Sequence, residues 1–180
     1  MQRWIPVLLT AVALTGCEIM PPAPAPTERI EVIDRGTERE REPEAELPAP
    51  GRVARQVAFP EAEYAALQRT GSGVISGRLS LNGTPGSGET VSVAPVTTYS
   101  AEAAEQALAG RAVEPADPRA REYTHTTRTD GQGHFSLNGI PAGEFYVSGS
   151  VVDPASGQRR VIIRQVSLGN GQRLEVNLSR

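Results

Sequence analysis

The chain has 180 residues, with 18 basic and 21 acidic side chains, a net charge of −3 and one cysteine. Every basic side chain is an arginine, and the arginines form no basic cluster, so nothing argues for binding to nucleic acid. A single cysteine excludes an internal disulfide framework, and it needs another explanation if the chain is exported.

The first 16 residues have the three parts of an export signal. Arg3 supplies a short positive region, and the run 4–14 is almost wholly apolar. An apolar run of this length rises only about 17 Å as a helix, too short for a hydrocarbon core of about 30 Å. The segment is therefore predicted to be a cleaved signal peptide and not a membrane span.

The signal ends in Leu14-Thr15-Gly16-Cys17, which resembles the lipobox of bacterial lipoproteins. That resemblance implies cleavage between Gly16 and Cys17, with a lipid attached to the Cys17 thiol as a membrane anchor. Because Glu18 and not aspartate follows, it further implies the outer membrane of a Gram-negative bacterium. The alternative is an ordinary secretory signal with a chance cysteine.

Residues 17–58 are predicted to be a disordered linker rich in proline and glutamate. Residues 18–50 carry nine acidic side chains and four arginines, a net charge of −5, whereas residues 71–180 carry ten of each. Proline disfavours regular pairing, and such charge has little apolar surface to bury. We expect a spacer that holds the rest of the chain away from the membrane. An acidic segment that binds a partner is the alternative.

Residues 59–70 are predicted to form a short helix, with Pro60 at its start and Gly71 after its end. From residue 71 the pattern changes to short alternating runs separated by glycine, which is typical of a β-sandwich. Ile75, Leu79 and Leu81 are expected to face the core. The strands are expected at 73–81, 90–96, 123–129, 134–137, 144–152, 160–168 and 173–178.

One segment interrupts this pattern. Residues 99–110 are rich in alanine, begin near Ser100 as a possible cap and end at Gly110, which predicts a helical insertion. Three pairs, Asn82-Gly83, Asp130-Gly131 and Asn170-Gly171, are expected to form tight turns with positive φ. The fold class is therefore mainly β, a sandwich with a short helical insertion.

Two segments carry a family resemblance. The strand 73–79 and the stretch 129–147, which reads Thr-Asp-Gly-Gln-Gly-His-Phe before Ile-Pro-Ala-Gly, resemble carboxypeptidase regulatory-like domains. This family implies a transthyretin-like (prealbumin-like) sandwich over residues 71–180, with Phe135 in its core. It doesn't imply an enzyme, because such domains act as folding or docking modules.

The only two histidines, His125 and His134, lie on adjacent predicted strands and are weak candidates for a metal site. Solvent-facing strand histidines are the favoured interpretation, because no third ligand stands at a defined spacing. We therefore predict no catalytic residue, no metal and no cofactor.

Binding residues are equally sparse. Tyr99, Tyr123 and Tyr146 are weak candidates for a sugar-binding platform, and Arg159 and Arg160 for an anionic ligand or a partner. The first functional hypothesis is a non-catalytic anchored module that docks an envelope protein. The alternative is a module that binds glycan or peptidoglycan, and a metal-dependent enzyme comes third.

Overall fold

The computed structural model describes residues 51–180. The predicted signal peptide, Cys17 and most of the predicted linker lie outside the described residues. The helices of the described part are α1 (Glu61–Ala65), α2 (Thr98–Leu108) and α3 (Pro118–Arg121). The strands are β1 (Arg52–Val53), β2 (Gly73–Leu81), β3 (Thr84–Pro85), β4 (Thr90–Pro95), β5 (Ala112–Val113), β6 (His125–Arg128), β7 (His134–Ile140), β8 (Gly143–Val152), β9 (Arg159–Leu168) and β10 (Arg173–Ser179).

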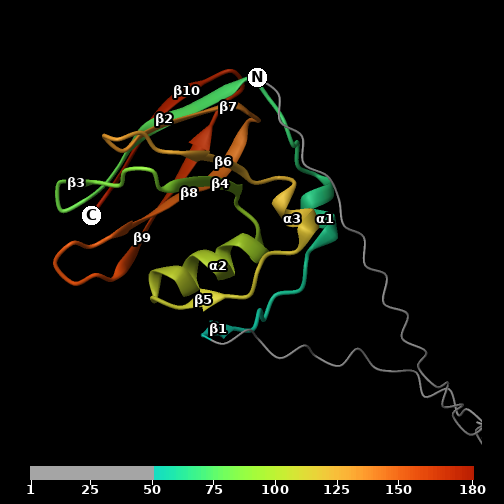
Figure 1. Ribbon diagram of the computed structural model, residues 1–180. Coiled ribbons are helices and arrows are strands. Elements are labelled where there is room, and N and C mark those ends of the chain that lie inside the picture. Colours follow the sequence, from blue (N-terminus) through green and yellow to red (C-terminus); the bar gives the residue numbers. More distant parts are fainter. Residues whose placement is uncertain (1–50) are drawn as a thin grey trace, which may run out of the picture. The chain divides into compact units, whose positions relative to one another are not determined.

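Two sheets form a sandwich, and α2 lies on the outside of one of them (Figure 1). In the first sheet β2 pairs with β10 in parallel, and with β7 and β3 in antiparallel. The second sheet has the order β6-β4-β8-β9 and is antiparallel throughout. The mainly β prediction, a sandwich with a helical insertion, is confirmed. No helix within residues 51–180 is long and apolar enough to cross a membrane.

The core lies between the two sheets. The predicted inward residues Ile75, Leu79 and Leu81 are buried, as are Phe135 and Phe145. They meet inward residues from every long strand in one continuous apolar cluster. Successive side chains of a strand point to opposite faces of the sheet, so the residues between these buried positions point outward, away from the core.

The helical insertion begins slightly earlier than predicted. Thr97, not Ser100, caps α2, and its side chain accepts a hydrogen bond from the Ser100 amide. The Ser100 hydroxyl in return accepts one from the Thr97 amide, so Ser100 is the second member of a capping box. α1 is also shorter than the predicted 59–70, with Pro60 as its N-cap.

The predicted linker extends too far. Residues 51–58 belong to the folded unit: β1 pairs with β5, and Arg55 is held by Glu114 and Glu102. This stretch has no run of apolar residues, and it is attached by polar contacts, so the hydrophobic pattern of the sequence did not predict that it is folded.

The turns follow the prediction in part. Asn82 and Gly83 both have positive φ, as predicted. In the turn after Thr129 the positive φ belongs to Gly133 and not to Asp130 or Gly131. Asp130 instead accepts hydrogen bonds at 2.8 Å from the amides of Gln132 and His134, which closes the turn through its side chain.

Replacing Asp130 with Asn is expected to preserve this turn and to remove part of the acid sensitivity. The amides of His134 and Gln132 hold the pKa of the Asp130 carboxyl below its ordinary value. A depressed pKa stabilises the fold above the unfolded-state value, about 3.9, and this contribution is lost as pH falls through the folded-state pKa. Urea unfolding across that range should show the stability gap between wild type and Asp130→Asn shrinking in acid. A gap that stays constant would contradict this role.

Candidate functional site

A cavity of about 210 Å³ lies between α2 and the outer face of the second sheet; we call it the α2 cavity. Its helix wall consists of Ser100, Ala103, Ala104 and Ala107, which recur on one face of α2. Alanine carries a single methyl group, so this face can't fill the space that larger side chains would occupy between a helix and a sheet. Its other walls come from the outer faces of β4, β8 and β9 and from residues around α3.

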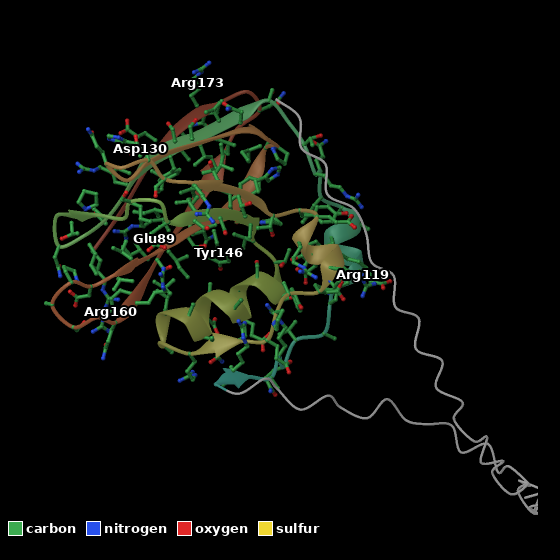
Figure 2. The ribbon with its side chains drawn as sticks, in the orientation of Figure 1. Glu89, Arg119, Asp130, Tyr146, Arg160 and Arg173 are labelled. Carbon is green, nitrogen blue, oxygen red and sulfur yellow. The ribbon has the colours of Figure 1, made fainter. Side chains whose placement is uncertain are left out.

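The sheet wall of the α2 cavity combines an aromatic ring with a small hydroxyl residue. Tyr146 and Ser148 of β8 line it beside Ala94, and Val161 and Ile163 of β9 add apolar surface. Figure 2 shows Tyr146 on the side of the second sheet that faces α2. Tyr146 and Ser148 are half-buried, and neither side chain hydrogen-bonds to residues 51–180, so both hydroxyls are free for a ligand.

One end of the cavity is closed by a second apolar cluster, separate from the sandwich core and centred on Tyr64, Tyr99 and Ala120. The Phe59 ring lies 4.7 Å from that of Tyr64 and 6.0 Å, edge-on, from that of Tyr99. Burial raises the pKa of Tyr64, whose hydroxyl bonds to Thr97. These rings are therefore packed against one another and position the N-terminal end of α2.

The segment before α1 completes the wall through Arg55. The Arg55 guanidinium lies 4.0 Å from the centre of the Tyr99 ring and donates to the carbonyls of Tyr99 and Glu114, both at 3.2 Å. The buried Glu102 carboxylate accepts from the amide of Gln56 at 2.5 Å and lies 3.7 Å from Arg55. Glu102 thus holds this segment against α2.

Glu102→Ala is expected to release the segment 51–57. The change leaves Arg55 and the Gln56 amide without their buried partner, which should cost about 3 kcal/mol. Trypsin should then cleave after Arg52 and Arg55 much faster than in wild type, as followed by mass spectrometry. Glu105→Ala, an exposed change on the same helix, is the matched control and should leave the cleavage rate unchanged. Equal rates in both variants would contradict the role of Glu102.

The predicted histidine pair isn't brought together. His125 lies on β6 in the second sheet, with its Nε2 buried and without a hydrogen-bond partner among residues 51–180. His134 lies on β7 in the first sheet and is exposed, with its Nδ1 3.4 Å from an Asp130 carboxylate oxygen. The connection between the two strands crosses from one sheet to the other, so the weak metal-site candidate isn't assembled. The favoured interpretation, solvent-facing histidines, fits His134 but not the buried Nε2 of His125. Residues 51–180 contain no group of three side chains placed to hold a metal ion.

The three predicted tyrosines have different surroundings. Tyr146 lines the α2 cavity. Tyr99 also lines it but is only 5% exposed, with its hydroxyl accepting from the Asp117 amide at 2.9 Å, so it isn't an open platform. Tyr123 lies outside this cavity, edge-on to Tyr64 and beneath Arg69.

The two predicted arginines also differ. Arg159 is paired with Glu89 at 2.7 Å and bonds to Ser150, whereas Arg160 is exposed near the start of β9. Sequence reasoning missed Arg55, Ser148 and the alanines of α2. The spacing of Ala103 and Ala107, one helical turn apart, was the available signal, but small residues on a helix face don't indicate that a space lies beside them.

The chain is similar to proteins of known structure. No family model and no curated protein matches the chain. The crystal structure of a candidate carbohydrate-binding protein from Pseudomonas aeruginosa matches with 30% sequence identity and a TM-score of 0.56, covering 69% of this chain and 99% of that one. The dioxygenase domain of a dioxygenase and carbohydrate-binding protein fusion from the cellulolytic bacterium Streptomyces sp. SirexAA-E matches with 13% identity and a TM-score of 0.38, covering 65% and 84%.

Proposed function

The chain belongs to the same family as the Pseudomonas aeruginosa protein, and from that premise we propose that it binds carbohydrate without catalysing a reaction. Family membership favours the second of the sequence-based hypotheses, the glycan-binding module, over the protein-docking module. The α2 cavity, with the Tyr146 ring and free hydroxyl groups, is the site we propose for the sugar.

The chemistry of the α2 cavity suits a sugar ring. A sugar has an apolar C–H face and a rim of hydroxyl groups, and a tyrosine offers a flat ring together with a polar tip. Tyr146 would stack on the face, while its hydroxyl and that of Ser148 would bond to the rim. At about 210 Å³ the cavity lies below the range of about 300–1,000 Å³ typical of drug-sized ligands, which favours a single sugar unit.

Binding of the full-length protein to a panel of oligosaccharides and to purified cell-wall fragments, measured by calorimetry, tests the proposal. Tyr146→Ala should weaken binding at least tenfold, and Tyr146→Phe should retain the part that stacking supplies. Ala107→Leu should abolish binding by filling the cavity, whereas Ala109→Leu, the same change at an exposed position, should not. Failure of every sugar to bind, or unchanged binding in Ala107→Leu, would overturn the proposal.

The setting proposed for this module is the outer membrane of a Gram-negative envelope, with the lipid on Cys17 as its anchor. The sequence Leu14-Thr15-Gly16-Cys17 supports this, because two or more acyl chains hold a protein stably to a bilayer. Cys17→Ala should move the protein from the membrane to the soluble fraction of disrupted cells, or leave it uncut. Continued labelling of the variant by a fatty-acid probe would contradict the anchor.

A further inference from the structure

A second hollow, of about 310 Å³, lies beside the α2 cavity, between the end of α2 and the start of β9. Ala107 and Val161 line both hollows, so the two adjoin. The walls of the second hollow include Arg111, Arg159, Arg160 and Arg180, and we call it the arginine cleft.

The arginine cleft has a surplus of positive charge. Among the described residues, no acidic side chain lines it. Arg159 is neutralised by Glu89, but Arg111 bonds only to the uncharged amide oxygen of Gln106, at 2.6 Å. Arg160 has no ion pair within 4.0 Å in residues 51–180, although it shares a neighbouring hollow with Asp153, which doesn't line the cleft. Figure 2 shows Arg160 near the start of β9, close to α2.

Two other groups complete the walls. The main-chain oxygen of Arg180 is held by the amide of Asn82 at 2.8 Å, and Arg180 is one of the residues that line the cleft. Leu108 lies beside the arginines and is 61% exposed, although it is a large apolar residue at the end of α2. A partner for this surface therefore needs a negative group next to an apolar face.

We propose that the glycan bound by this protein is acidic, with its carboxylate or phosphate group held by Arg111 and Arg160 in the arginine cleft. The inference rests on the proposed function, because a sugar unit in the α2 cavity places the next unit of the chain at the cleft. Guanidinium groups form paired hydrogen bonds with carboxylates and phosphates, and Leu108 contacts the C–H face of that unit.

The test uses the full-length protein and pairs of trisaccharides that differ only in the group at C6: galacturonic against galactose, glucuronic against glucose and mannuronic against mannose. In at least one pair the acidic member should bind about tenfold more tightly or better, a difference of about 1.4 kcal/mol. Added sodium chloride should weaken only the acidic member, because salt screens exposed charges.

Variants then locate the effect. The double change Arg111→Gln and Arg160→Gln should bring the affinity for the acidic member down to that for the neutral one. The double change Arg128→Gln and Arg173→Gln removes the same charge from exposed positions outside the cleft and should leave the preference intact. Figure 2 shows Arg173 at the opposite end of the sandwich from Arg160.

The outcomes separate the two proposals. Equal affinity for both members of every pair would overturn the acidic-glycan inference and leave carbohydrate binding in place. Inorganic phosphate that binds as tightly as any acidic trisaccharide would also overturn it, because the anion alone would then be recognised. If no sugar of either kind binds, the proposed function fails and the inference fails with it.

Discussion

Gly77→Ala is expected to destabilise the fold by about 3 kcal/mol or more, a large part of the 5–15 kcal/mol typical of a domain. Gly77 lies in β2 between β10 and β7, opposite Val176 and Phe135. A Cβ atom there would stand 1.9 Å from the carbonyl oxygen of Val176 and 3.2 Å from the Phe135 ring. The first contact is with the backbone of β10, which can't rotate away, so β2 and the edge strand β10 would have to separate.

Urea unfolding followed by circular dichroism measures this effect. Gly131→Ala is the matched control, because a Cβ at Gly131 meets no atom within 4 Å and its φ isn't positive. That variant should be as stable as wild type or slightly more stable, since alanine restricts the unfolded chain. A Gly77→Ala protein with wild-type stability would show that β2 and β10 aren't paired in this register.

Leu79→Ala should cost about 3 kcal/mol, and part of that loss should be restored by a second change, Gly149→Ala. Leu79 is fully buried, and a Cβ at Gly149 would stand 2.9 Å from one of its terminal methyl carbons. Gly149→Ala by itself overfills the core at a cost of about 1–2 kcal/mol. In the Leu79→Ala background the new methyl group occupies vacated space, so the double variant should be at least about 1 kcal/mol more stable than the sum of the single changes.

The single and double changes at Leu79 and Gly149 form a double-mutant cycle, and a second cycle with Leu178→Ala in place of Leu79→Ala is the control. Leu178 is equally buried, but its side chain isn't among the nearest neighbours of a Cβ at Gly149. Its loss and that of Gly149→Ala should therefore add. Strict additivity in both cycles would contradict the packing of Leu79 of the first sheet against Gly149 of the second.

Gly77→Ala and Leu79→Ala leave the proposed binding surfaces untouched. The α2 cavity and the arginine cleft lie on the outer side of the second sheet, away from Gly77 and Leu79 of the first. A stability variant that still folds should therefore keep its affinity for a sugar. Loss of affinity in Tyr146→Ala or Ala107→Leu at unchanged stability can accordingly be assigned to the binding site.

The seven longer strands, the inward residues and the turn at Asn82-Gly83 could be predicted from the sequence, whereas the two-residue strands β1, β3 and β5 could not. The predicted features depend on period-two alternation and on local backbone preferences, which neighbouring residues decide. The placement of Ile75, Leu79 and Phe135 in the core followed from that alternation. The alanine-rich helix was predicted for the same reason, although its cap was shifted to Thr97 by a reciprocal hydrogen bond with Ser100.

The remaining features depend on contacts between segments that are far apart in the chain. Arg55 and Glu102 meet across 47 positions of the chain, and Ala107 and Val161 across 54, so no local pattern relates them. The α2 cavity exists because short side chains on a helix stand over Tyr146 and Ser148 on a sheet. The positive charge of the arginine cleft exists because Arg111 and Arg160 meet there and no acidic side chain is part of its lining. Both hollows lie between segments that are distant in the sequence. Strand pairing and packing create them, and they can't be predicted from composition.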